Sequence, residues 1–395
     1  MNIRMPLMLL ALLLCSTTVM AEDHVVESGL PWPGTDVVKP GDRLLLTPGM
    51  HPSVILKEYR GAPGAPIVID SVDQQSPAII GGGQWTMDLQ ECDHITIGTL
   101  LLTGGLEGCL RIHGTAERPS RQITVQGSYL AKPGKSLGSA NGIDARFVNG
   151  LFIMGVRIDH WERAAITASD CEGILMANVI CGGNLDSKMG LELGSNVRKV
   201  DAQHFVAENI RGPGVMIAAS PKPTQTAGSE PNQPRHAAED IRLLRCSFVK
   251  TDLPISIGSA RNVLINQCLF FEPSSCILGF RKTSAPFSSA SEITFENNLT
   301  NWSVGGLRRF LCNVEDAKDV TFGENLWWSQ EMPEAVEYLG PLPGDANDRQ
   351  VYDLDPQLTP RTLNPQTKNA IKFGPRSPKA DTGEKDPAIT SPGPE

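Results

Sequence analysis

Apolar and polar residues alternate in nine short stretches of the chain, and all nine follow one pattern. Each runs apolar, polar, apolar, then a small turn, then two further apolar positions. Side chains of a strand point alternately to opposite faces, so this pattern predicts β-strands with one buried face. The first residues of the nine stretches are Ile95, Ile123, Leu151, Ile174, Val200, Ile241, Val263, Ile293 and Val320.

The spacing of the stretches predicts a coiled architecture. Successive first residues are 28, 28, 23, 26, 41, 22, 30 and 27 positions apart, and no helical periodicity lies between them. A repeat of this length with strand periodicity is typical of a β-solenoid. If the coils stack about 4.8 Å apart, equivalent residues form continuous apolar columns inside a tube. A β-propeller is excluded, because each blade needs four antiparallel strands in roughly 40 residues.

Polar and sulfur-containing residues recur inside the predicted core. Asn298 and Asn325 hold the sixth position of their stretches, and we expect them to hydrogen-bond to each other and to turn backbone, as stacked amides do. Eight cysteines follow residue 21, without a CxxC pair, and Cys246 and Cys268 also hold the sixth position. We interpret the cysteines as small buried residues rather than as a disulfide framework or a zinc site.

A second strand precedes most stretches, and its outward residues form two polar columns. The gap to the next stretch is six residues at several corners, for example from Ala145 to Leu151 and from Ile257 to Val263. A fixed gap without a helix predicts one tight corner and parallel sheets. The first column is Arg111, Asp144, Thr167, Glu192, Ser256 and Asn313; the second is His113, Arg146, Ser169, Gly194, Gly258 and Glu315.

Several of these segments resemble a known group of folds. Gly190-Leu-Glu-Leu-Gly-Ser and Asn262-Val-Leu-Ile-Asn are similar to repeats of the pectate-lyase-like, right-handed parallel β-helix proteins. Lys39-Pro-Gly-Asp-Arg and Gly64-Ala-Pro-Ile resemble the N-terminal part of secreted chondroitinase B-like and alginate lyase proteins. Asp355-Pro-Gln-Leu resembles a closing segment of the wider group. The resemblance implies an all-β, right-handed parallel β-helix of about nine or more coils.

The sequence predicts a division of the chain into five parts. Residues 1–21 resemble a secretory signal, with Arg4, a short apolar core and a small-residue cleavage site after Ala21. The apolar run is too short to be a membrane anchor. We therefore expect a secreted or periplasmic protein. The further parts are N-terminal strands and a cap over 22–90, the β-helix over 91–330, an irregular segment over 331–375 that packs on or near the helix, and a disordered tail over 376–395.

Charge limits the partners of the protein. The whole chain has 35 Lys and Arg against 44 Asp and Glu, a net charge of −9. An acidic surface disfavours nucleic acid and acidic membranes. It also mildly disfavours strongly anionic polymers unless a local basic groove exists. We therefore expect no nucleic acid partner. The resemblance implies a polysaccharide partner, and we expect a monomer with no transmembrane segment after removal of the signal.

The first candidate site lies where the polar columns are most charged. Arg111, His113, Asp144 and Arg146 come from adjacent coils, and Lys188 and Glu192 come from a coil further along. A lyase acting on a uronic acid needs a cation to neutralise the carboxylate, a base and an acid. The two arginines suit the first task, and His113 or Lys188 the second.

Two further residue roles complete the candidate site. Asp144 and Glu192 have the oxygen ligands that calcium prefers, or alternatively the two carboxyl groups of a glycoside hydrolase. Trp161 offers a face on which a sugar ring could stack.

Two classes of function remain. The first is polysaccharide lyase activity on a uronic-acid-containing polymer, with glycoside hydrolysis as a variant. The second is a noncatalytic β-helix that binds glycans or serves as an envelope or surface scaffold. A cleft over the charged columns favours the first class, and an open flat wall favours the second.

Overall fold

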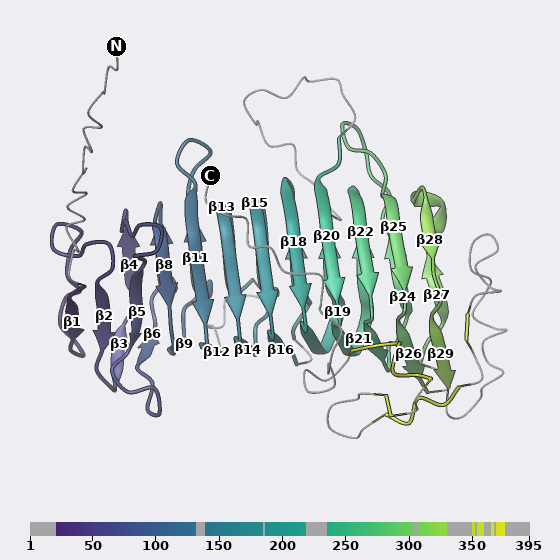
Figure 1. Ribbon diagram of the computed structural model, residues 1–395, viewed down its shortest axis with the longest axis horizontal. Coiled ribbons are helices and arrows are strands. Elements are labelled where there is room, and N and C mark those ends of the chain that lie inside the picture. The colour runs from purple at the N-terminus through teal and green to yellow at the C-terminus, as the bar shows by residue number, and fades with distance from the viewer. Residues whose placement is uncertain are drawn as a thin grey trace, which may run out of the picture.

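The computed structural model describes residues 21–131, 139–184, 186–218, 235–303, 306–329, 350–351, 354–358, 365–366 and 369–375. These residues form 29 strands and one short 3-10 helix, η1 (Val314–Asp316). All strand pairs between the named strands are parallel, and the strands stack side by side along the long axis of the molecule from β1 to β29 (Figure 1). The chain is therefore a parallel β-helix, as the repeat and the resemblance predict.

Three parallel sheets make up the wall of the helix. Sheet 1 contains β4 (Val54–Lys57), β7 (Trp85–Gln90), β10 (Gly108–His113), the first parts of β13 (Asn141–Met154) and β15 (Ala164–Ala177), β17 (Met189–Leu193), the last parts of β19 (Val206–Ile217) and β21 (Ser247–Ile257), β24 (Cys276–Phe280) and β27 (Arg309–Cys312).

Sheet 2 contains β1 (Asp23–Val26), β2 (Arg43–Leu46), β5 (Ile67–Ser71), β8 (Asp93–Ile97), β11 (Ser120–Gln126), the last parts of β13 and β15, β18 (Val197–Gln203), β20 (Ala238–Leu244), β22 (Ala260–Asn266), β25 (Ser291–Glu296) and β28 (Val320–Phe322). Sheet 3 contains β3 (Met50–Pro52), β6 (Ile79–Gly81), β9 (Leu101–Thr103), β12 (Tyr129–Ala131), β14 (Arg157–Asp159), β16 (Ile180–Gly182), the first parts of β19 and β21, β23 (Leu269–Phe271), β26 (Leu299–Trp302) and β29 (Leu326–Ser329).

The inward columns have the predicted register. Ile123 is the Cα partner of both Ile95 and Leu151, and the column continues without a break to Val320. Nearly all of its members are fully buried. The eighth positions of the repeat also stack, and there Phe248 and Phe270 have ring centroids 5.3 Å apart. Apolar ladders of like residues thus fill the tube.

Left-handed backbone conformations make the corners tight enough to need no helix. Phe147 (φ 52°) and Asp170 (φ 53°) turn β13 and β15 from sheet 1 into sheet 2 without interrupting either strand. Such conformations cost a non-glycine residue about 1–2 kcal/mol, which stacked neighbours in successive coils must offset. The corner fixes which side chains of β13 and β15 face outward from sheet 1.

The predicted asparagine pair and buried cysteines are confirmed. The Asn298 amide donates to Asn325 Oδ1 at 3.0 Å, and the backbone N–H of Cys268 donates to Asn298 Oδ1 at 2.8 Å. All eight cysteines of the described residues are free thiols, and seven of them are buried. Burial raises the pKa of Cys171 to about 12, so this thiol packs as a small apolar group.

The expected start of the β-helix and the expected last members of the polar columns differ from the structure. The ladders of sheet 2 already include β2 and β5, so the stack begins well before residue 91 and takes in much of the segment expected to be a cap. At the other end, Asn313 and Glu315 do not continue the polar columns. Cys312 is the strand residue paired with Gly279, after which the chain enters η1.

The described parts of the C-terminal segment lie against sheet 3. The Trp327 backbone N–H donates to the Val351 carbonyl at 2.9 Å, and the Val351 N–H donates to the Asn325 carbonyl. Ala370 and Phe373 are buried against Leu269, Leu299 and Leu326. The expected signal cleavage region up to residue 20 and the tail over 376–395 lie outside the described residues. Within the described residues no helix has the length and apolarity to cross a membrane.

Candidate functional site

All but Lys188 of the charged residues predicted from the sequence lie in two neighbouring outward columns on sheet 1. Arg111 is the Cα partner of Asp144, Asp144 of Thr167, and Thr167 of Glu192. His113 and Arg146 are partners in the neighbouring column. The column also continues upstream to Asp88 on β7, which pairs with Arg111. Five successive coils therefore present polar side chains on one face.

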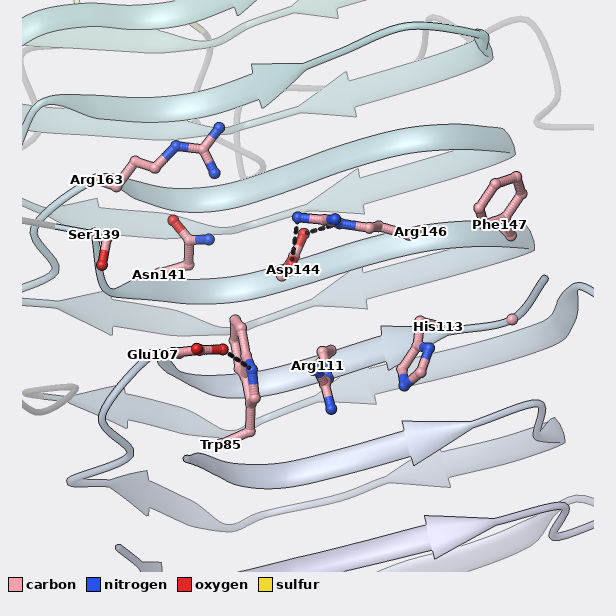
Figure 2. Close-up of a pocket in the computed structure, with 11 residues that line it drawn as sticks. Trp85, Glu107, Arg111, His113, Ser139, Asn141, Asp144, Arg146, Phe147 and Arg163 are labelled. Atoms are coloured by element: carbon pink, nitrogen blue, oxygen red, sulfur yellow. Dashed lines mark hydrogen bonds and ion pairs between the residues drawn. The ribbon is translucent and has the colours of Figure 1, made fainter. Parts of the chain in front are cut away.

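A pocket of about 470 Å³ opens on this face over β7, β10, β13 and the start of β15 (Figure 2). Its strand-end side is formed by His113, Arg146 and Phe147. Its strand-start side carries Trp85, Glu107, Ser139, Asn141 and Arg163. Arg111 and Asp144 lie between the two sides. The face is thus hollowed around the charged columns rather than flat.

Asp88 is buried next to the pocket and contacts two residues that line it, Arg111 and His113. Its carboxylate accepts hydrogen bonds from Arg111 Nε at 2.9 Å and Gln90 Nε2 at 2.7 Å, and a second one from Arg111 Nη2. His113 Nε2 lies 3.3 Å from Asp88 Oδ1. Burial alone would raise the pKa of Asp88, but the contacts with His113 and Arg111 outweigh it and hold the pKa well below its ordinary value.

Asp144 is held by Thr167 of the next coil and by Arg146 of its own strand. The Thr167 hydroxyl donates to Asp144 Oδ1 at 2.7 Å, and Arg146 Nη2 lies 3.2 Å from Asp144 Oδ2. The Asp144 side chain is buried, whereas that of Arg146 is 57% exposed. Arg146 also donates from Nε to Asp144 Oδ1, at 3.3 Å. Because the guanidinium is largely exposed and both contacts are long, it can leave Asp144 for a ligand anion at a cost of about 1 kcal/mol.

Glu192 and Lys188 lie apart from His113. Glu192 accepts a hydrogen bond from Arg163 Nη2, which closes the strand-start side of the pocket. Lys188 is exposed and precedes β17, three strands away from the β10 strand that carries His113. At about 4.8 Å per strand this separation is roughly 14 Å, so Lys188 and His113 do not act on one atom.

The predicted calcium site does not fit these residues. Thr167 stands between Asp144 and Glu192, so their Cα atoms are roughly 10 Å apart. Each carboxylate already has an arginine partner, whereas calcium requires six to eight oxygen ligands. Among the described residues no group of three His, Cys, Asp or Glu side chains converges on one point.

Trp161 is a core residue, so the interpretation of it as a sugar-stacking residue was wrong. Its side chain is fully buried, and its indole Nε1 donates to the Met189 carbonyl at 2.6 Å. The loop that carries Trp161 turns inward between two coils. An aromatic residue in a polar loop looks exposed in a sequence, because the sequence does not show which coil covers it.

Five residues used in the description of this site were missed: Trp85, Asp88, Glu107, Asn141 and Arg163. A signal for the first two was present, because Ile67 lies 28 residues before Ile95, which is the same step as between later coils. Extending the repeat upstream places 85–90 in the strand before β10. Trp85 is nearly buried, its Nε1 donates to Glu107 Oε2 at 2.9 Å, and Arg111 lies 5.6 Å from the ring centre.

No protein-family model and no curated protein matches this chain. Among solved structures it is similar to an alginate lyase from Paenibacillus sp. str. FPU-7, with 12% identity over 76% of this chain and 98% of that one and a TM-score of 0.41. It is also similar to the PL6 family alginate lyase AlyGC (12% identity, 90% and 57%, TM-score 0.40) and to pectate lyase Pel9A (13% identity, 75% and 78%, TM-score 0.36). These similarities assign no residue of the site, and the fold is established by the strand register itself.

Proposed function

We propose that the pocket on sheet 1 binds an acidic polysaccharide and that the protein cleaves it by β-elimination at a uronic acid. The observation that carries the proposal is the juxtaposition of His113, whose Nε2 lies 3.3 Å from the buried Asp88 carboxylate, with Arg146 in the register position of the next coil. A proton-transfer group and an exposed cation thus meet beside a pocket. Several structurally similar proteins are alginate or pectate lyases, which agrees with a polysaccharide ligand.

His113 has the surroundings of a general base. His113 Nε2 lies 3.3 Å from Asp88 Oδ1 and makes no hydrogen bond with any described residue. A neutral ring with its proton on Nε2, toward this carboxylate, has its lone pair on Nδ1. In the proposed reaction Nδ1 takes the proton next to the uronate carboxyl group. The electron pair of that C–H bond forms the new double bond as the C–O bond to the leaving sugar breaks. The imidazolium then returns the proton to the leaving oxygen.

The role of Arg146 is to neutralise the uronate carboxylate. Negative charge accumulates on that carboxylate when the neighbouring proton leaves, and a guanidinium binds a carboxylate in a bidentate manner. Arg111 is less suited, because it is less exposed than Arg146 and its Nε hydrogen bond to Asp88, at 2.9 Å, is shorter than that of Arg146 to Asp144, at 3.3 Å. Arg111 and Asp88 are therefore positioning residues. Calcium has no part in these steps.

Glycoside hydrolysis is less well supported by the same face. A hydrolase needs one carboxyl group that holds its proton near neutral pH. Asp88 has a lowered pKa and cannot serve as that acid. Asp144 and Glu192 are each paired with an arginine.

A noncatalytic glycan-binding role is the second candidate. Arg111, Arg146 and Arg163 each pair with a carboxylate of the same face, an arrangement that also serves to fix the strand register. In that role the face would bind a glycan through its shape and through hydrogen bonds, because its arginine charges are already paired.

Incubation with a panel of uronate polymers, with and without Ca²⁺, tests the proposal. We expect absorbance from an unsaturated uronate with at least one polymer, and its loss in a His113→Ala variant. Retention of a polymer without unsaturated product or new reducing ends would favour the binding role. Neither binding nor cleavage across the panel would refute both.

A further inference from the structure

The strand-start side of the pocket has a chemistry different from the charged strand-end side. Trp85, Gly108 and Asn141 are register partners on three successive coils. A side chain at Gly108 would come within 2.2 Å of the Trp85 ring, so the indole occupies the space over β10 that this glycine leaves open. Figure 2 shows the ring rising from β7 across β10 toward Asn141. The indole thus forms an apolar floor beside the Asn141 amide.

Asn141 has a buried side-chain amide without a protein partner. The residue is 4% exposed, and its Oδ1 is enclosed yet accepts no hydrogen bond. Within the described part of the chain, its side-chain NH₂ also donates to no group. Buried amides are normally paired, because an unmade hydrogen bond is unfavourable. An unpaired amide in the wall of a pocket is therefore a group that a ligand can satisfy.

The surrounding groups select hydroxyls rather than a carboxylate. Glu107 accepts hydrogen bonds from Trp85 Nε1 and from Gln84, and its negative charge disfavours an anion nearby. Arg163 on the rim is paired with Glu192, and Arg111, which lies 5.6 Å from the Trp85 ring centre, is paired with Asp88. An aromatic floor, a neutral amide and a carboxylate acceptor together suit the apolar face and hydroxyl groups of a sugar ring.

We propose that Asn141, Trp85 and Glu107 form a hydroxyl-binding subsite for a sugar distant from the one at His113 and Arg146. This inference rests on the proposed polysaccharide ligand. Asn141 and Arg146 are five residues apart on one extended strand, which is about 17 Å, so only an oligosaccharide reaches both sides. The subsite therefore makes binding depend on ligand length.

The test measures how substitutions of Asn141 change the binding of ligands of two lengths. Di- and tetrasaccharides of galacturonate and of mannuronate are titrated calorimetrically into the full chain, in a His113→Ala background that prevents cleavage. Asn141→Leu removes the amide at similar volume, and Asn141→Ala repeats the test with a smaller side chain. Asn149→Leu is the matched control, because Asn149 lies on the same strand but is exposed on sheet 2.

We expect Asn141→Leu to weaken tetrasaccharide binding at least tenfold and to leave disaccharide binding unchanged. It should also raise the melting temperature of the free protein, since an unpaired buried amide is removed. The control should change neither binding constant. Equal weakening of both ligands, unchanged tetrasaccharide binding, or a lowered melting temperature in both Asn141 variants would overturn the subsite.

A further ligand separates failure of the proposed uronate-binding function from failure of the subsite. If the His113→Ala parent binds no uronate ligand, cellotetraose, a neutral tetrasaccharide, becomes the probe of the subsite. Cellotetraose binding that Asn141→Leu abolishes would support the subsite while refuting the uronate ligand. Failure of cellotetraose to bind as well would overturn the subsite.

Discussion

Replacing Asp88 by Asn tests the centre of the proposed site. The substitution keeps the shape of the side chain but removes the charge that pairs with Arg111 and His113. The Asp88 side chain is only 3% exposed, whereas both partners are 32% exposed. Breaking a fully buried ion pair costs about 3–5 kcal/mol, and the partial rehydration of the two partners reduces this. We expect a loss of about 2–3 kcal/mol at pH 7.

Asp144→Asn provides the matched control in the same column. Its cation, Arg146, is 57% exposed and returns to water, and the Thr167 hydroxyl still has an acceptor in the new amide. We expect a loss of about 1 kcal/mol or less. Both variants are compared with the wild type by urea denaturation followed by far-UV circular dichroism, and the midpoints and slopes are compared separately.

The effect of Asp88→Asn should depend on pH in a defined direction. The folded pKa of Asp88 lies below the unfolded value of about 3.9. The charge therefore stabilises the folded state fully above about pH 4, and this stabilisation is lost as the pH falls toward the folded pKa. The difference between wild type and variant should shrink between pH 4 and pH 2.5. An equal difference at pH 7 and pH 2.5, or a loss no larger than that of Asp144→Asn, would refute the reasoning.

Four further outcomes follow from the geometry. His113→Ala should lower the rate of unsaturated product formation by 10²–10⁴-fold with an unchanged dichroism spectrum, and a loss below tenfold would contradict its role as base. Trp161→Phe should cost about 1 kcal/mol in urea denaturation and leave polymer retention intact, because its indole hydrogen bond is internal; impaired retention at wild-type stability would contradict this. Asn325→Ala should cost about 1–3 kcal/mol by leaving Asn298 without its partner, and unaltered stability would show that the stacked amides are dispensable. Cys171 should resist a thiol reagent at pH 8 until the protein unfolds, and rapid modification of the native protein would disprove its burial.

The fold could be predicted because strand periodicity and coil spacing act on many residues at once. An error of one residue in the predicted register would have placed a member of the column from Ile95 to Val320 on the outer face. The observed register agrees with the prediction along the whole column. Prediction failed where the pattern was interrupted. Met216 and Gly279 hold places in the outward column but lie in segments without clear alternation, and Asn313 was chosen by spacing although the strand had already ended at Cys312.

The site could be predicted only in part, because its chemistry depends on side-chain partners. Register placed Arg111, Asp144 and Glu192 on one face. It did not show that Asp88 would join Arg111 and His113, or that Trp161 would turn inward. Which ionic groups pair is decided by rotamers and burial, and neither follows a period along the chain.

Because each coil contributes one residue to a column, the effect of an inserted or deleted coil on the site depends on its position in the stack. A duplicated or deleted coil beyond Glu192 would lengthen or shorten the molecule and leave the spacing of His113 and Arg146 as it is. A coil inserted between β10 and β13 would instead move these two residues apart by roughly another 4.8 Å. Selection on the proposed activity would therefore disfavour insertions between β10 and β13 and tolerate them beyond Glu192.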